Sequence, residues 1–241
     1  MIQPLLAALA VIASTIVALP AQDSAPAKVE IRMLAFSSAQ QKKEAFAHDP
    51  LADATAAPVP APIKTYLNHQ FSTVVLKSRK VVFTTKVSRD SLTTPEDVIG
   101  EVTLPQGLNS AILLFLPGKD KNSAQILAIN DSKRAFPAGS FHATNLSPLP
   151  IKLMLEEKQV DFKPGQAHLI EDPPTGDTGQ TAMRTFSFRN NAWGPVATSL
   201  WPHPGDARSV LIFYQNPNAG EVQLRSFVDV PPREPQADAT P

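Results

Sequence analysis

The sequence contains no cysteine, and this absence excludes several kinds of chemistry at once. Disulfides, cysteine nucleophiles, thiolate metal sites and the lipid anchor of bacterial lipoproteins all require a thiol. Small exported domains usually depend on disulfides, but a chain of 241 residues can bury enough apolar surface to fold without them. If the chain is exported, the lack of cysteine therefore fits a bacterial periplasm or exterior better than a eukaryotic secretory route.

An excess of charge of either sign is also missing. Lysine plus arginine and aspartate plus glutamate number 22 each, so the net charge at neutral pH is zero. No local cluster of basic residues stands out along the chain. Binding to nucleic acid depends on a basic patch or stripe, and we therefore expect no nucleic-acid partner.

Long apolar runs are scarce, and the one at the amino terminus predicts a signal peptide over residues 1–21. The apolar run extends from Leu5 to Leu19, and Ala21 offers a small residue for cleavage. No lysine or arginine precedes the run and Leu19 is large for its position, so an uncleaved anchor is the alternative. The run falls short of the roughly 20 residues that a membrane span needs. We expect export to the periplasm or exterior, with no stable membrane span after cleavage.

Three stretches show no strand alternation. Residues 40–47 are predicted to form a turn of helix. The segment 49–62, rich in alanine and proline, is predicted to be a loop or an extended linker. Residues 233–241 are predicted to be a disordered tail.

The alternation typical of β-strands is clearest between Phe136 and Asp172. Ile151, Leu153 and Leu155 would lie on one face, as expected for a sheet with one buried side. The other face would carry Lys152, Met154 and Glu156. Pro164 and Gly165 then suit a type II turn, in which glycine accepts a positive φ. We interpret this stretch as an antiparallel meander.

Further strand signals, separated by glycine, proline and asparagine, predict an all-β protein, an antiparallel β-sandwich of immunoglobulin-like or Greek-key type. Residues 111–116 are apolar on both faces, which indicates a central strand covered on both sides. One continuous sandwich over residues 28–232 is the first choice, and two lobes, 28–131 and 132–232, the second. We detect no internal repeat in the sequence. The remaining predicted strands lie near residues 29–33, 71–76, 81–87, 98–104, 125–129, 181–188, 193–201, 209–215 and 221–229.

Several of these turns resemble those of known proteins. The combination of Phe136 to Phe141, the Asn145-Leu146-Ser147-Pro148 turn, Lys163-Pro164-Gly165 and the strands from Trp193 to Asp229 resembles a group of uncharacterised secreted bacterial proteins of similar length. The asparagine-proline turn and the proline-glycine turn are also faintly similar to periplasmic accessory proteins of alginate acetylation. Neither resemblance implies a known active site.

No catalytic template emerges from the residues. There is no Gly-x-Ser-x-Gly elbow, and Ser140 with His142 two residues later reads as an ordinary strand entry. Glu156 and Glu157 are adjacent, so on a strand they would point to opposite faces and could not act as a paired acid and base. We therefore predict that the protein is not an enzyme and uses no cofactor.

A metal site is the weaker reading of the histidines. His142 and His168 could lie on neighbouring strands and share zinc with Glu171 or Asp172. No two histidines have the spacing that would let one element supply two ligands, so surface or rim histidines are favoured and no metal is predicted.

Trp193 and Trp201 are the candidate ligand platform. They are eight residues apart, so on one unbroken strand they would share a face, separated by about 26 Å at ~3.3 Å per residue. Two exposed indoles flanking small residues would stack well on sugars. The favoured alternative places both in the core, or on different faces because of a bulge at Gly194-Pro195.

These observations predict a secreted, non-enzymatic binding or assembly module of the bacterial envelope. Its partner would be an envelope protein or polysaccharide. The alternative hypothesis is an accessory or carbohydrate-binding protein for an envelope or extracellular polysaccharide.

Overall fold

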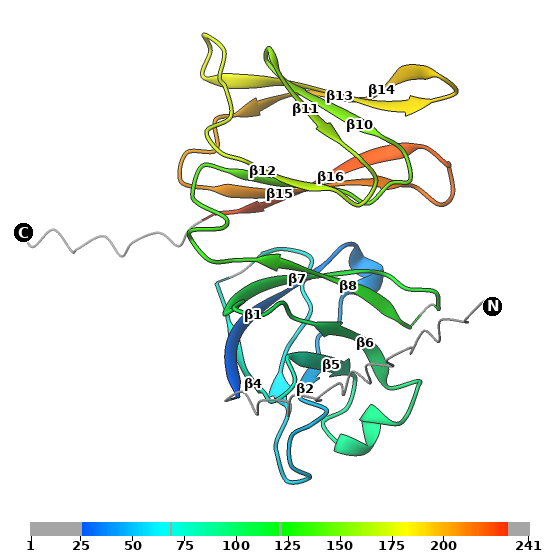
Figure 1. The fold of residues 1–241 in the computed structure, drawn as a ribbon. Helices are drawn as coiled ribbons and strands as arrows, with labels where there is room; N and C mark the ends of the chain where they lie inside the picture. Colours follow the sequence, from blue (N-terminus) through cyan, green and yellow to red (C-terminus); the bar gives the residue numbers. More distant parts are fainter. Residues whose placement is uncertain (1–25, 68, 121, 231–241) are drawn as a thin grey trace, which may run out of the picture.

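A computed structural model describes residues 26–67, 69–120 and 122–230. The predicted signal peptide and the predicted tail lie outside these residues. The described chain forms sixteen strands and two short 3-10 helices, η1 and η2. The strands build four sheets of four strands each, so the prediction of an all-β sandwich is confirmed (Figure 1).

The first eight strands form two sheets, which we call the N-lobe. One sheet has the order β4-β1-β7-β8 and the other β3-β2-β5-β6. The elements are β1 (Ala27–Ala35), η1 (Ser38–Gln40), β2 (Phe46–His48), β3 (Val59–Pro60), β4 (Ser72–Leu76), β5 (Lys80–Thr84), η2 (Arg89–Leu92), β6 (Val98–Thr103), β7 (Ser110–Pro117) and β8 (Ala124–Asn130).

The last eight strands form the other two sheets, which we call the C-lobe. Their orders are β12-β9-β15-β16 and β11-β10-β13-β14. The elements are β9 (Phe141–Asn145), β10 (Ile151–Leu155), β11 (Lys158–Phe162), β12 (Ala167–Ile170), β13 (Gln180–Arg189), β14 (Ala192–Pro202), β15 (Arg208–Gln215) and β16 (Val222–Asp229).

The two lobes have the same topology. Adding eight to each strand number of the N-lobe sheets gives the orders of the C-lobe sheets, including the parallel pairs β1 with β7 and β9 with β15. β7 (SAILLFLP) and β15 (RSVLIFYQ) even share one burial pattern along their length. The chain therefore contains a structural repeat that the sequence did not reveal, because few identical residues carry it. No described strand of one lobe pairs with a strand of the other.

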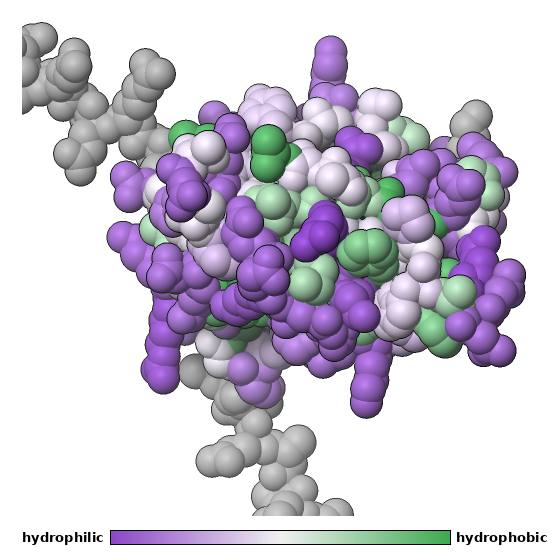
Figure 2. Space-filling model, turned by 90° about the horizontal axis from the view of Figure 1, so that it is seen from above, coloured by the Kyte–Doolittle hydropathy of each residue, from purple (hydrophilic) through white to green (hydrophobic). Residues whose placement is uncertain are grey.

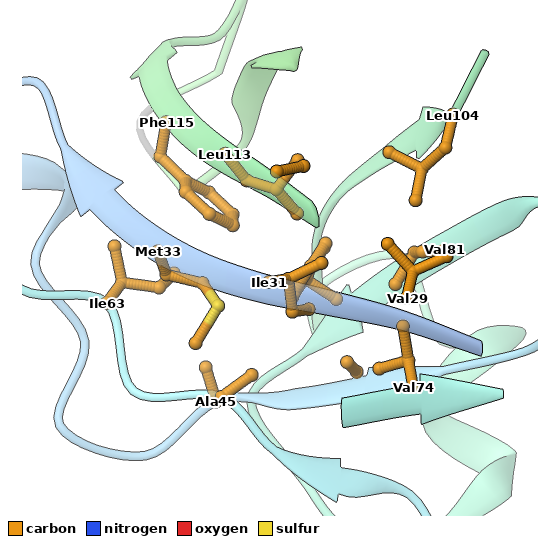
Figure 3. Packing of buried hydrophobic residues seen from close by; sticks show 14 of the residues in the cluster. Val29, Ile31, Met33, Ala45, Ile63, Val74, Val81, Leu104, Leu113 and Phe115 are labelled. Carbon is orange, nitrogen blue, oxygen red and sulfur yellow. The ribbon is translucent and has the colours of Figure 1, made fainter. Parts of the chain in front are cut away.

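β7 is a central strand covered on both faces, as predicted. Leu113 and Phe115 point into the N-lobe core with Ile31 and Met33 of β1 (Figure 3). Ile112 and Leu114 point the other way, into a second cluster that faces the C-lobe. A strand buried on both sides needs apolar residues at every position, which explains the unbroken apolar run.

That second cluster joins the lobes. The β4-β1-β7-β8 sheet faces the β12-β9-β15-β16 sheet, and their side chains form one buried core (Figure 1). Equivalent positions of the two lobes meet there: Ile112 and Val210, Leu114 and Ile212, Ile129 and Phe227. We call this set the inter-lobe core.

The stretch from Phe136 to Asp172 is not a simple meander, and that prediction is wrong. β9 and β12 belong to one sheet of the C-lobe, whereas β10 and β11 belong to the other. The chain crosses between sheets at the proline-rich turn after Asn145. The chain crosses back after β11, near Lys163. The buried Asn145 amide donates to the carbonyl oxygens of Leu149 (2.8 Å) and Lys163 (3.2 Å), so it stabilises both crossings. Gly165 has a φ of 76°, as the predicted turn requires.

One further prediction for the N-lobe needs correction, and another holds in part. Residues 40–47 do not form a helical turn: η1 ends at Gln40 and β2 begins at Phe46, because Ala45 and Ala47 pack into the core. The alanine-proline segment 49–62 is mostly loop, but it is no spacer between bodies. Its end forms β3 beside β2, and Ala61 is fully buried.

Candidate functional site

Four charged side chains meet between the lobes and form a buried arginine-aspartate quartet: Arg32, Asp131, Arg208 and Asp229. Arg32 donates Nε and Nη2 to Asp131, each at 2.8 Å, and Nη1 and Nη2 to Asp229 at 2.9 and 2.8 Å. Arg208 donates to Asp131 at 2.8 Å and also to Asp229. Two cations and two anions thus neutralise one another across the boundary.

The strands explain why these four residues converge. Arg32 lies on β1 with its neighbours Ile31 and Met33 pointing to the N-lobe core, so Arg32 points to the C-lobe. Asp131 directly follows β8, and Asp229 ends β16 at the equivalent position of the repeat. Arg208 begins β15 opposite Asp229.

The opposite charges of the quartet hold the pKa values of two of its members away from their ordinary values. Arg32 is 2% exposed, and burial by itself lowers its pKa. The hydrogen bonds that Arg32 donates to Asp229 and Asp131, together with the negative charge of both carboxylates, outweigh that effect and raise the pKa of Arg32 above its ordinary value. For Asp229, burial raises the pKa, but hydrogen bonds from Arg32 and Arg208 bring the pKa below 3.8. Arg32 and Asp229 are therefore both charged at neutral pH.

The quartet forms one wall of a cavity of about 910 Å³ that opens between the lobes. Two aromatic rings flank it, with the Arg32 guanidinium 5.3 Å from the ring of Phe71 and that of Arg208 4.5 Å from the ring of Phe136. The cavity is also lined by exposed polar residues from both lobes, namely His69, Lys133 and Asp206. We call this cavity the inter-lobe cleft.

This arrangement favours binding over chemistry within the quartet. The guanidinium groups already bind both carboxylates, so the wall of the cleft carries no net charge for an incoming ion. A ligand would instead contact the partly exposed Phe71 ring and the polar rim. Cavities at lobe boundaries, with apolar walls and a few convergent polar groups, are typical ligand sites.

The predicted tryptophan platform does not form, because the two indoles lie on different faces of their sheet. β14 runs from Ala192 to Pro202 as expected, but its register against β13 shifts between Thr185 and Phe186, leaving Val196 as an extra residue. Trp201 packs edge-on against the buried Phe141 at 5.3 Å, on the inner face. Trp193 is 41% exposed on the outer face.

The histidines considered for a metal site are also kept apart. His142 on β9 pairs with Leu169, the neighbour of His168 on β12, so the two histidines point to opposite faces. His142 packs against Phe136 and His168 against Phe162, at 5.9 and 4.9 Å between ring centres. Within the part of the chain that the structure describes, no group of three potential metal ligands occurs.

The other residues weighed for catalysis have structural partners. The Ser140 hydroxyl donates to the carbonyl oxygen of Pro137 at 2.6 Å. Glu156 lies in the β10-β11 turn at a φ of 48° and accepts from the backbone N–H of Ala182. Glu157 is exposed beside it.

The quartet was not predicted from the sequence. In the sequence, Arg32 alternates with the apolar residues Ile31 and Met33, and its own strand face also carries Leu34, which is fully buried. An arginine that shares a strand face with large apolar residues indicates a covered face with a buried partner. That signal was present, but it did not identify Asp131 and Asp229, which lie about one hundred and two hundred residues away.

Comparisons with known proteins add little to this description. No family model and no curated protein matches the chain. Among solved structures, human GIVD cytosolic phospholipase A2 matches over 86% of this chain and 32% of its own, at 13% identity and a TM-score of 0.23. This chain thus spans about a third of the length of that protein. Among the described residues, no helix has the length and apolarity to cross a membrane.

This comparison corrects one prediction. The matched structure is an enzyme, which contradicts the expectation that the chain is non-enzymatic, and that expectation is withdrawn. A TM-score of 0.23 is too low to transfer phospholipase activity to this chain.

Proposed function

We propose that the protein is an exported binding or assembly module of the bacterial envelope and that it holds its ligand in the inter-lobe cleft. The observation that carries this proposal is the cleft itself, which has a volume of about 910 Å³ and is built by both lobes. A rigid frame favours binding, because less conformational entropy is lost when the ligand is held. The quartet and the inter-lobe core provide such a frame.

Export is part of the proposal. It rests on the apolar run and cleavage site predicted within residues 1–21, together with the absence of cysteine. We also propose that each lobe is immunoglobulin-like. The support for this is a pair of packed four-stranded sheets in each lobe, between which the chain crosses through the connections that join the strands.

Site-specific photo-crosslinking in intact cells tests the cleft. A photoreactive phenylalanine analogue at Phe71, on the cleft wall, should yield a discrete crosslinked product. The control is the same analogue at Val87, which is 59% exposed and does not line the cleft. A product at position 71 and none at 87 supports the proposal. Equal labelling at both positions, or no product at 71, contradicts it. Digestion of the product with protease or with glycan-degrading enzymes then identifies the partner as protein or polysaccharide.

A second candidate function is that of an accessory or carbohydrate-binding protein for an envelope or extracellular polysaccharide. It is favoured by the exposure of Trp193 on a sheet face outside the cleft.

A further inference from the structure

The outer face of the β11-β10-β13-β14 sheet carries an unusual set of side chains. Alternation along β13 buries Thr181, Met183 and Thr185 and leaves Phe186 and Phe188 on the outer side. Trp193 of β14 pairs with Phe188, with 5.2 Å between the ring centres. Figure 2 looks onto this side of the molecule and shows pale and apolar side chains across its middle, with hydrophilic ones around them. The face therefore presents a row of aromatic rings.

The Trp193 indole stands between two hollows. One, of about 430 Å³, is lined by side chains with both donors and acceptors, among them Gln159, Asp161 and Gln166. The other, of about 330 Å³, includes Arg189 and Glu221. An exposed ring with polar hollows on either side matches the chemistry of a sugar chain, whose rings offer C–H faces for stacking and hydroxyls for hydrogen bonds.

The cations on this face point to the charge of that sugar chain. The Lys152 Nζ lies 4.4 Å from the centre of the Trp193 ring. Among the described residues, no carboxylate lies within ion-pairing distance of Lys152, Lys163 or Arg184. Asp161, the acid that lines the first hollow, lies opposite Lys152 in the β10-β11 register and accepts a hydrogen bond from Gln159 at 2.8 Å, so one carboxylate faces the three cations. Positive charge is thus left available beside the aromatic row.

We infer that this outer face binds an acidic polysaccharide. The C–H faces of its sugar rings stack on Trp193, and its carboxylates pair with Lys152 and its cationic neighbours. This inference deepens the second candidate function and rests on it. It does not depend on the inter-lobe cleft, which lies at the lobe boundary and shares no lining residue with either hollow.

Affinity electrophoresis tests the inference. The protein lacking residues 1–21 is run in native gels containing polygalacturonate or hyaluronan, and in gels containing fully methyl-esterified polygalacturonate, which keeps the sugar backbone without its charge. We expect retardation by the acidic polymers and none by the ester. Trp193→Ala should abolish the retardation, and Lys152→Gln should reduce it.

The matched control is Tyr66→Ala. Tyr66 is 58% exposed in the N-lobe and has its own cation, Lys64 Nζ, 5.7 Å from the ring centre, so it reproduces the cation-aromatic pair outside the proposed face. The control variant should be retarded like the original protein. Circular dichroism verifies that each variant is folded, and Lys152→Gln provides a second test if Trp193→Ala is not.

Three results would overturn the inference: no retardation by either acidic polymer, equal retardation by the ester, or unchanged retardation of Trp193→Ala. None of these would bear on crosslinking at Phe71, so failure of the inference is distinguishable from failure of the cleft proposal.

Discussion

Asp131 and Asp229 occupy equivalent positions in the two lobes, and both carboxylates bind the same guanidinium nitrogen, Arg32 Nη2, at 2.8 Å. The structural repeat therefore brings two like charges together at the lobe boundary. Two arginines from different lobes compensate them. Two ion pairs cross the lobe boundary: Arg32 of the N-lobe pairs with Asp229 of the C-lobe, and Arg208 of the C-lobe pairs with Asp131, which follows β8.

Removing one cation of the quartet should destabilise the protein strongly. In Arg32→Met, two buried carboxylates lose their main partner, and the expected loss is about 3–5 kcal/mol of unfolding free energy. Urea denaturation measures it. The control is Lys77→Met, which removes the exposed pair with Asp53 and should cost at most about 1 kcal/mol. Similar losses for the two variants would mean that the quartet contributes no more than a surface ion pair.

The two lobes should unfold together. They share the inter-lobe core, so separating them would expose residues of both. Both tryptophans lie in the C-lobe, so fluorescence follows that lobe alone, whereas far-UV circular dichroism follows both. We expect coincident thermal transitions by the two probes.

A substitution in the N-lobe extends this test. Ile112→Ala opens the inter-lobe core from the N-lobe side and should cost about 2–5 kcal/mol. The tryptophan transition should shift by as much as the dichroism transition. A fluorescence transition left unchanged by Ile112→Ala would show that the lobes are energetically independent.

Acidification should weaken the fold in two separate steps. Burial lowers the pKa of His142 and of His48 below 6.5, so the unfolded chain binds protons that the folded chain does not. Stability is therefore lost as the pH falls from about 6.5 toward the lower folded-state values. His142→Phe should reduce this first step in urea titrations at several pH values. An unchanged pH dependence would contradict the assignment to His142.

The second step belongs to the quartet. The pKa of Asp229 in the folded state lies below its ordinary value of 3.8, so its contribution is complete above that value and is lost on further acidification. Asp229→Asn should remove this step while lowering stability at neutral pH. A full acid transition remaining below pH 4 in that variant would assign the step to other carboxyls.

The junction of β6 and β8 offers a steric prediction. A Cβ at Gly100 would lie 2.5 Å from the carbonyl oxygen of Ala124, which is backbone and cannot turn aside. Gly100→Ala should therefore lower the thermal midpoint. Gly194→Ala is the control, because nothing lies within 4 Å of the added carbon, and it should be neutral or slightly stabilising. Equal midpoints for the two variants would refute the close approach of these strands.

The sequence predicted strands better than it predicted which strands become neighbours. The alternation of residues predicted β10 and β14, and a run that is apolar on both faces predicted β7. Both patterns can be recognised because successive side chains of a strand point to opposite faces of its sheet. The crossing after Asn145 was missed because a proline turn looks alike whether the next strand stays in the sheet or leaves it. The bulge at Val196, which separates Trp193 from Trp201, directly follows the Gly194-Pro195 step that the sequence offered as a bulge in one alternative, but its position depends on pairing with β13.

The candidate site was less predictable than the fold for the same reason. The quartet joins residues from β1, β15 and the ends of β8 and β16, and only the folded chain makes them neighbours. Trp193 was singled out from its residue type alone, and its partner Lys152 became visible only through the three-dimensional arrangement.

The shared topology of the lobes has a consequence for which side chains each lobe can carry at the boundary. Matching sheets that meet through matching residues are what two identical copies would form across a two-fold axis. Tethering the copies in one polypeptide makes their association independent of concentration. It also allows equivalent positions of the two lobes to carry different residues. Arg32 corresponds to His142, and Arg208 to Ser110, so each arginine of the quartet occurs in one lobe only. A symmetric dimer would carry each of these residues twice, whereas two lobes in one polypeptide can hold a single, asymmetric ion-pair network.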